Sequence, residues 1–263
     1  MKNKIGVCSW SLKNDAEGLA RVLGNTGLSS LHLDVSAADK LRGMIAEKGW
    51  TVSCTMVGFP QEDYSSLDAI RLTGGIVPDD VWPENRQIVL DAIGTTADMG
   101  VKLLSFHAGF IDHTDEAGFQ TFRKRISEFA DVAQESGITI LLETGQETAE
   151  DLRHFLDVVN HPALGVNFDP ANMILYGKGD PIEAVGVLGP WIKHVHIKDA
   201  VASQTPGQWG AEVPWGEGEV NHGGFFQALE KVGFTGAMAI EREAGDRREK
   251  DIQLTVERLE VCV

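Results

Sequence analysis

Cysteine is scarce in this chain, and the little that is present is badly placed for cross-linking. Three cysteines occur in 263 residues, at positions 8, 54 and 262. This odd, widely spaced set excludes a disulfide framework and a zinc motif of paired cysteines. Cys8 and Cys54 stand inside apolar runs, so we interpret both as small core residues.

Basic residues and long apolar runs are also in short supply. Lys and Arg number 23 against 39 Asp and Glu, which gives a formal net charge of −16. Such a field repels phosphate backbones and anionic lipids, so broad nucleic-acid or membrane binding is disfavoured. The N-terminal segment turns polar within a few positions, and no apolar run reaches the roughly 18 residues of a membrane span. We therefore expect no leader, no membrane contact and a cytoplasmic location.

What the chain does have is an alternation of short apolar runs with longer amphipathic stretches. One such stretch, 115–137, begins at acidic residues and stops at Gly137, as a helix should. Strands separated by helices imply parallel pairing with right-handed crossovers. The pattern predicts an α/β fold, a (β/α)8 TIM barrel that takes up 1–263 as a single domain. The eight runs cover 5–10, 30–35, 50–57, 102–109, 138–143, 164–169, 193–198 and 237–241.

A doubly wound open sheet is the alternative architecture. It needs a glycine-rich phosphate loop after the first strand, and CSWSLKND offers none. Two aperiodic stretches rich in Gly and Pro, 58–80 and 200–220, each follow a predicted strand. We expect both on the C-terminal face of the barrel, where long loops are usually functional.

The last four predicted strands each end in an acid or a histidine. Because alternate strand residues face the barrel interior, these side chains converge at its C-terminal end. Clustered carboxylates raise one another's pKa, and a divalent cation removes that cost. Three carboxylates and one imidazole predict one divalent metal ion, Mn²⁺ first, with Mg²⁺, Co²⁺ or Zn²⁺ as alternatives. Taken singly, each acid could be only a helix cap or a surface group. The four residues are Glu143, Asp169, His196 and Glu241.

Other inward-facing residues are candidates for substrate contacts, each with a structural alternative. His194 competes with His196 for the metal, but it lies one layer deeper, so we interpret it as a hydrogen-bonded core histidine. Lys198, at the rim, could bind a substrate oxygen or phosphate, or pair with Asp169 or Asp199. The remaining candidates for the pocket are His107, Asn172 and Trp10, together with Trp209, Trp215, His32 and Asp34, for which capping or packing is the alternative.

Six motifs in order resemble one known family: FHAG, LLE, FDPAN, HVHIKD, VPWGEGEV and AIERE. They are similar to the sugar phosphate isomerase/epimerase group of the xylose-isomerase-like barrels, from the first strand to the last helix. The run 138–245 looks most like the L-ribulose/L-xylulose 5-phosphate 3-epimerases, and the metal quartet also resembles that of the tagatose/psicose 3-epimerases. This resemblance implies the same four metal ligands, Glu143 and Glu241 as the acid/base pair, and often a homodimer.

The implied reaction is proton transfer next to a ketose carbonyl through a metal-bound enediolate, on a small-molecule sugar or sugar phosphate. Asn172 stands where the tagatose/psicose enzymes have a histidine, Lys198 where an arginine is expected, and Ala149 where they have a second glutamate. These departures favour a sugar phosphate over a free ketohexose.

Three alternatives remain open. A metal-dependent dehydratase of an inosose or a dehydroshikimate-like acid uses the same proton abstraction and then loses water. A non-catalytic sugar-binding barrel would keep the pocket but could dispense with the paired glutamates. An endonuclease IV-like enzyme would need more histidines and a basic groove, which the charge of −16 opposes.

Overall fold

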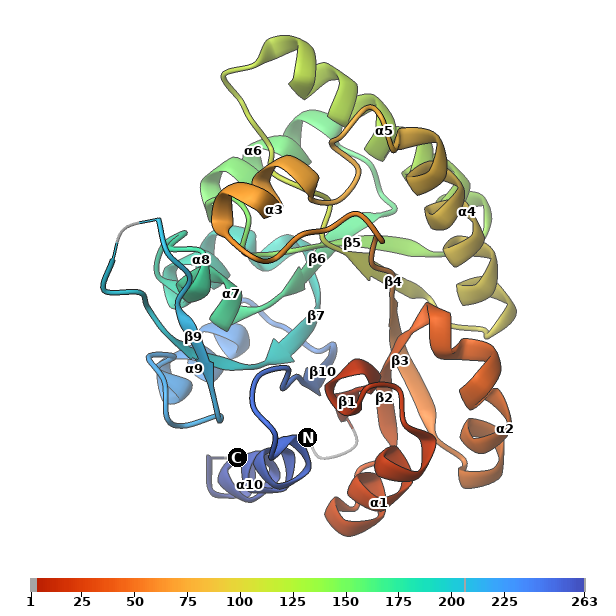
Figure 1. Cartoon of the computed structure of the whole chain (residues 1–263), viewed down its shortest axis with the longest axis vertical. Helices are drawn as coiled ribbons and strands as arrows, with labels where there is room; N and C mark the ends of the chain where they lie inside the picture. Colours follow the sequence, from red (N-terminus) through yellow and green to blue (C-terminus); the bar gives the residue numbers. More distant parts are fainter. Residues whose placement is uncertain (1–3, 206, 263) are drawn as a thin grey trace.

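Eight parallel strands close into a barrel in the computed structural model, which describes residues 4–205 and 207–262 (Figure 1). Around the barrel the order is β1-β10-β7-β6-β5-β4-β3-β2, so the first and last strands are neighbours. The predicted TIM barrel is confirmed. Its strands are β1 (Ile5–Cys8), β2 (Ser30–Asp34), β3 (Thr51–Met56), β4 (Leu103–Phe106), β5 (Thr139–Glu143), β6 (Leu164–Phe168), β7 (Ile192–Ile197) and β10 (Ala237–Ile240).

Helices surround the barrel and connect its strands (Figure 1). The predicted helix at 115–137 begins after Asp115, whose carboxylate accepts a hydrogen bond from the Gly118 N–H, and it ends just before Gly137 with φ +68°. The α-helices are α1 (Ala16–Thr26), α2 (Ala38–Lys48), α3 (Leu67–Thr73), α4 (Trp82–Asp98), α5 (Glu116–Glu135), α6 (Ala149–Val159), α7 (Pro170–Leu175), α8 (Pro181–Leu188), α9 (His222–Lys231) and α10 (Arg248–Cys262), and the 3-10 helices are η2 (Ser9–Leu12), η3 (Val35–Ala37) and η4 (Gly189–Trp191).

One parity of strand residues builds the apolar layer between barrel and helices. Alternation along each strand sends these side chains outward and leaves the other parity to the interior. The interior is polar: His32, Ser105, Asn167 and His194 are all fully buried there. The outward set in the apolar core comprises Val7, Leu31, Leu33, Leu104, Phe106, Ile140, Leu142, Val166, Phe168, Val195, Ile197, Met238 and Ile240.

The two long loops contain secondary structure that was not predicted from their sequences. Within 58–80 lies the short helix α3, capped by Ser66, whose hydroxyl accepts from the Ala69 N–H. Within 200–220 an antiparallel hairpin forms from β8 (Asp199–Val201) and β9 (Ala211–Val213). Gly109 of the FHAG motif fixes the first loop: its φ is +97°, and a Cβ would lie 2.6 Å from the Gly74 carbonyl oxygen.

Cys8 and Cys54 are fully buried, which confirms their predicted place in the core. The side chain of Cys262 lies outside the described residues. No helix within 4–205 or 207–262 is both long and apolar enough to cross a membrane.

Candidate metal centre and substrate pocket

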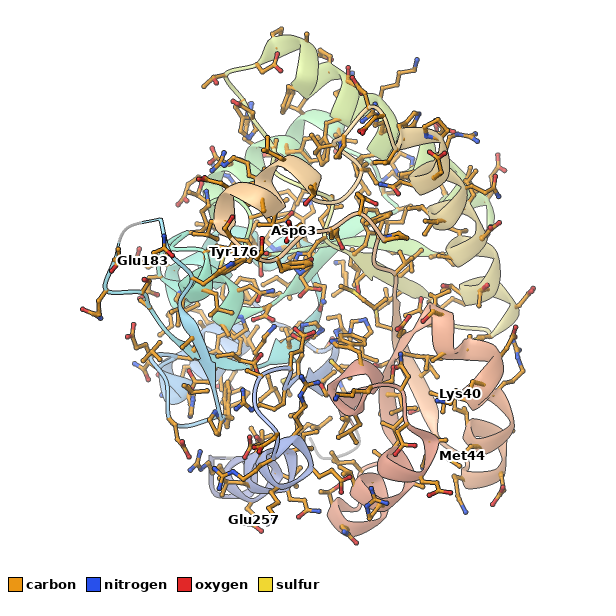
Figure 2. The ribbon with its side chains drawn as sticks, in the orientation of Figure 1. Lys40, Met44, Asp63, Tyr176, Glu183 and Glu257 are labelled. Carbon is orange, nitrogen blue, oxygen red and sulfur yellow. The ribbon has the colours of Figure 1, made fainter. Side chains whose placement is uncertain are left out.

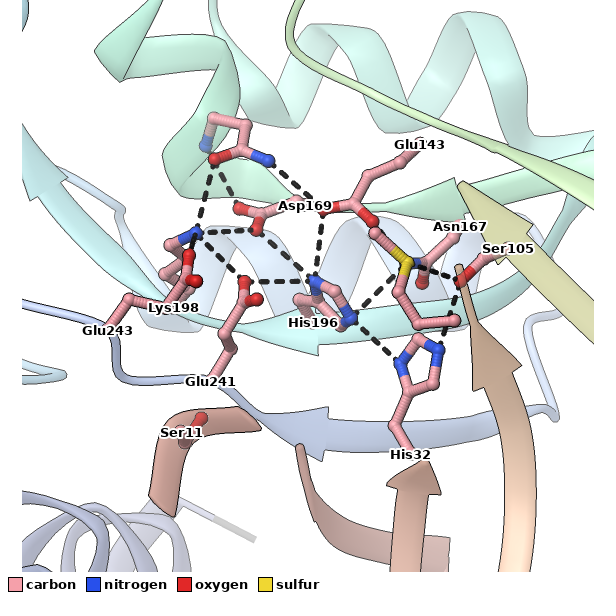
Figure 3. Close-up of polar contacts among 12 residues, drawn as sticks. Ser11, His32, Ser105, Glu143, Asn167, Asp169, His196, Lys198, Glu241 and Glu243 are labelled. Atoms are coloured by element: carbon pink, nitrogen blue, oxygen red, sulfur yellow. Dashed lines mark hydrogen bonds and ion pairs between the residues drawn. The ribbon is translucent and has the colours of Figure 1, made fainter. Parts of the chain in front are cut away.

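Four strand ends bring the predicted quartet together at one end of the barrel (Figure 3). Glu143 ends β5, His196 lies in β7, and Asp169 and Glu241 directly follow β6 and β10. His196 Nδ1 lies 3.4 Å from Glu143 Oε1, 3.3 Å from Asp169 Oδ2 and 3.1 Å from Glu241 Oε2. All four side chains are buried. One imidazole nitrogen therefore sits among three carboxylates supplied by three other strands.

Neighbouring opposite charges and burial together set the pKa of each group in this cluster. Burial lowers the pKa of His196, but the carboxylates of Glu241 and Glu143 outweigh it and raise that pKa well above its ordinary value. Burial raises the pKa of Glu241, and Lys198 and His196 overcome it and hold that pKa well below the usual range. For Asp169 burial prevails and raises the pKa. Buried carboxylates that lie next to cationic side chains are also suited to bind a divalent metal ion. A set of three oxygen donors and one nitrogen donor is typical of sites for ions such as Mn²⁺ or Mg²⁺.

A chain of neutral histidine and serine supports the far side of His196. Its Nε2 lies 3.0 Å from His32 Nδ1, and His32 Nε2 lies 3.0 Å from Ser105 Oγ. Burial and the two neighbouring imidazoles lower the pKa of His32 well below its ordinary value, so His32 carries a single N–H. If Nδ1 of His196 faces the ligand site with its lone pair, Nε2 donates to His32, which donates to Ser105. A hydrogen-bond partner on the ring nitrogen that faces away from the metal fixes the tautomer of a metal-binding histidine.

His194 lies deeper, as the parity argument predicted. Its Nδ1 is 2.9 Å from Asn167 Oδ1 and its Nε2 is 3.2 Å from Ser53 Oγ. Asn167 in turn donates from Nδ2 to Glu143 Oε2 at 3.0 Å. His194 is thus a hydrogen-bonded interior residue that orients the quartet through Asn167 rather than facing the carboxylates.

Lys198 and Asn172 form a polar rim beside the quartet. Lys198 Nζ lies 2.8 Å from Glu241 Oε2, 3.6 Å from Asp169 Oδ2 and 3.3 Å from Glu243 Oε2. Asn172 Oδ1 accepts from Lys198 at 3.3 Å, while its Nδ2 donates to Glu143 Oε1 at 3.1 Å. Of the two ion pairs considered for Lys198, the structure has the one with Asp169. Asp169 also caps α7 by accepting from the Asn172 N–H.

His107 and Trp10 each contact one of the paired glutamates. His107 Nε2 lies 3.4 Å from Glu143 Oε1, and Trp10 Nε1 donates to Glu241 Oε1 at 2.5 Å. Both line a cavity of about 700 Å³ above the quartet, together with Asp34 of β2. The residues selected for the metal or the substrate, Trp215 excepted, therefore lie in or directly beneath one pocket.

The two loop tryptophans have different surroundings. Trp209 lines the pocket, with its ring centroid 4.7 Å from that of Tyr176. Trp215 is buried away from it and stacks on His222 with centroids 3.8 Å apart, so the prediction that it walls the pocket gives way to the packing alternative. Sequence reasoning missed several lining residues: Glu62, Tyr64, Tyr176, Glu212 and Glu243.

Asp199 organises the VPWGEGEV loop rather than pairing with Lys198. Its buried carboxylate accepts hydrogen bonds from the N–H groups of Gly216, Gly218 and Val220, and it lies 3.0 Å from His222 Nε2. These bonds outweigh burial and lower the pKa of Asp199. The loop after β9 is therefore tied to β8 by one side chain.

Asp199→Asn should lower the free energy of unfolding by about 2–3 kcal/mol. The amide NH₂ would face backbone N–H groups from which the carboxylate accepts hydrogen bonds, and two donors cannot bond to each other. Urea denaturation measures this loss. Glu217→Gln, in the same loop but exposed and ion-paired with Arg258, is the matched control and should change stability by less than about 0.5 kcal/mol. Equal effects of the two substitutions would contradict the role given to Asp199.

Comparison with known proteins agrees with this architecture. Residues 15–262 match the family described as xylose isomerase-like TIM barrel. The chain is 27% identical over 181 residues to L-ribulose-5-phosphate 3-epimerase UlaE of Salmonella typhi, covering 65% of this chain and 60% of that one. It is 24% identical over 251 residues to a ketose 3-epimerase of Arthrobacter globiformis, covering 88% and 80%. The chain thus spans about three fifths of the Salmonella enzyme.

A solved structure extends the agreement over the whole chain. The xylose isomerase domain protein of Planctomyces limnophilus is 27% identical, covers 100% of this chain and 98% of its own, and superposes with a TM-score of 0.91. A family match over 15–262 leaves only short ends outside it. This chain belongs to the xylose isomerase-like TIM barrel family.

Proposed function

We propose that this chain, as one domain over 1–263, is a divalent-metal-dependent isomerase or epimerase that transfers a proton next to the carbonyl of a ketose. One observation carries the proposal: two buried glutamates, Glu143 and Glu241, line the same cavity from the two ends of the strand arc β5-β6-β7-β10. A substrate between them presents one carbon to two carboxylates, as inversion or transfer of a proton requires.

The partners of each glutamate support its part in proton transfer. Burial raises the pKa of Glu143, but His107 and His196 outweigh burial and lower it, so Glu143 is ionised and can accept a proton. Asn172 and Asn167 hold its two oxygens in place. Glu241 is ionised as well, in an ion pair with the Lys198 ammonium 2.8 Å from its Oε2. Whichever glutamate removes the substrate proton, a protonated group on the other face has to return one, so Glu241 would act as the acid only after taking up a proton.

Glu143, Asp169, His196 and Glu241 would hold the metal, which we propose to be Mn²⁺, with Mg²⁺, Co²⁺ or Zn²⁺ as alternatives. When bound, such an ion supplies a Lewis acid that polarises neighbouring carbonyl and hydroxyl oxygens. Lys198, Asn172 and His107 would orient the substrate hydroxyls, and the Trp10 ring would cover one side of the sugar.

The proposal predicts deuterium exchange at the carbon next to the carbonyl. Mn²⁺-loaded protein, incubated in D₂O with a panel of ketoses and ketose phosphates, should incorporate deuterium there and produce an epimer or an aldose, which proton NMR detects. Appearance of an eliminated, UV-absorbing enone instead would assign the site to a dehydratase. Binding without exchange across the panel would favour a sugar-binding barrel.

A further inference from the structure

The pocket is acidic well beyond the four proposed metal ligands. Asp34 at the end of β2, Glu62 between β3 and α3, Glu212 in β9 and Glu243 after β10 all line it. These acids come from four separate segments, so they border the cavity on several sides.

The cationic groups of the pocket are already engaged. Among the described residues that line the cavity, Lys198 is the single lysine or arginine. Its ammonium is 5% exposed and contacts Glu241, Glu243 and Asp169. The nearby Arg242 lies outside the lining, where it binds Glu212 at 2.6 Å and Asp251 at 3.0 Å. Phosphate groups in proteins are usually met by arginine, lysine or clustered backbone N–H groups with free capacity.

Glu62 is held in place on the pocket wall by two backbone N–H groups. Its Oε1 accepts from the Gly75 N–H at 3.0 Å and its Oε2 from the Phe59 N–H at 3.3 Å. Burial raises the pKa of Glu62. Negative charge is therefore already costly in this cavity, and a dianionic phosphate would add to that cost.

The rest of the lining suits an uncharged sugar. Four aromatic rings present apolar faces and polar edges that match the C–H faces and hydroxyls of a sugar. Figure 2 shows Tyr176 left of the centre of the molecule, within its outline rather than at its edge. Carboxylates accept hydrogen bonds from sugar hydroxyls, and a cavity of about 700 Å³ has room for a sugar phosphate, so selection would act through charge rather than size. The rings belong to Trp10, Tyr64, Tyr176 and Trp209.

From these contacts we infer that the substrate is an unphosphorylated ketose and that the acidic lining, with Glu62 as its fixed member, rejects the phosphate ester. The inference rests on the proposed function and narrows it. It also reverses the preference for a sugar phosphate that the sequence motifs suggested, because three of the four additional acids, Asp34, Glu62 and Glu212, lie outside those motifs.

The test compares matched pairs in D₂O: each ketopentose and ketohexose of a panel, and its terminal phosphate ester, with Mn²⁺-loaded full-length protein. We expect kcat/KM for exchange to be at least about 100-fold higher for the free ketose. Exchange with the phosphate esters alone would overturn the inference and leave the proposed function standing. Exchange with neither member of any pair would overturn the proposed function and the inference with it.

Glu62→Gln isolates the charge effect. The ratio of kcat/KM for free ketose to that for phosphate ester should fall about tenfold, since one fixed negative charge leaves the pocket wall. Asp63→Asn removes the same charge from the adjacent, exposed position and should leave the ratio unchanged. This ratio does not depend on the fraction of active protein, so partial unfolding cannot mimic the result. An unchanged ratio in Glu62→Gln would overturn the assignment to Glu62.

Discussion

Glu143→Gln and Glu241→Gln should each reduce interconversion of the substrate by about 1,000-fold or more. Each change removes one of the two groups that accept or return the proton, and general acid–base groups contribute rate factors of about 10² to 10⁴. Both side chains are buried and hydrogen-bonded, so glutamine keeps the size while losing the basicity. The measurement is kcat with saturating Mn²⁺. Activity retained in both variants would refute the acid/base pair.

Loss of a metal ligand is a competing reason for the same result, and exchange kinetics separate the two. If Glu143 and Glu241 act on opposite faces of one carbon, each variant should still exchange the proton of one epimer, and the two variants should spare opposite epimers. Loss of the metal would stop both exchanges in both variants. Calorimetric titration with Mn²⁺ gives the affinity of each variant directly. Glu217→Gln, exposed on the loop after β9, is the inert control.

Strand parity explains why so much of the site could be predicted. A strand of known direction fixes which residues face inward, and a barrel fixes that all strands end on one face. Glu143, Asp169, His196 and Glu241 follow from those two facts, and so does the deeper position of His194. Glu243 has the same parity as Glu241 and could have been found by the same rule.

Strand parity cannot predict which residues on long loops enter the pocket. Glu62 and Tyr64 enter the pocket because the segment before α3 folds back over the barrel, held by Gly75 and the FHAG loop. The spacing of apolar residues does not predict the course of this loop, because loop conformation depends on backbone hydrogen bonds and on the torsion angles of glycines. For the same reason the β8–β9 hairpin and the packing of Trp215 on His222 could not be predicted.

Glu147→Gln should stabilise the protein at neutral and alkaline pH. Glu147 follows β5 and is buried, and its Oε2 has no hydrogen-bond partner among the described residues. Burial raises its pKa from 4.5 to about 8, with Lys178 opposing the shift only in part. The folded protein thus holds the proton more tightly than the unfolded chain. The contribution of Glu147 to stability is most favourable below about pH 4.5 and becomes less favourable as the pH rises toward 8, because the folded state must then ionise Glu147 or keep a proton that the unfolded chain has lost.

The size of this effect follows from the shift. Each pKa unit corresponds to about 1.4 kcal/mol, so at pH 7 the buried acid costs about 3 kcal/mol. Glutamine carries no titrating proton and should recover most of that free energy at pH 7 to 8 and less than about 1 kcal/mol at pH 5. Urea denaturation at pH 5, 6.5 and 8 measures the difference, with Glu150→Gln, exposed in the first turn of α6, as the matched control. A gain that does not grow with pH would mean that Glu147 is ionised in the folded protein, with Lys178 as the cation that compensates it.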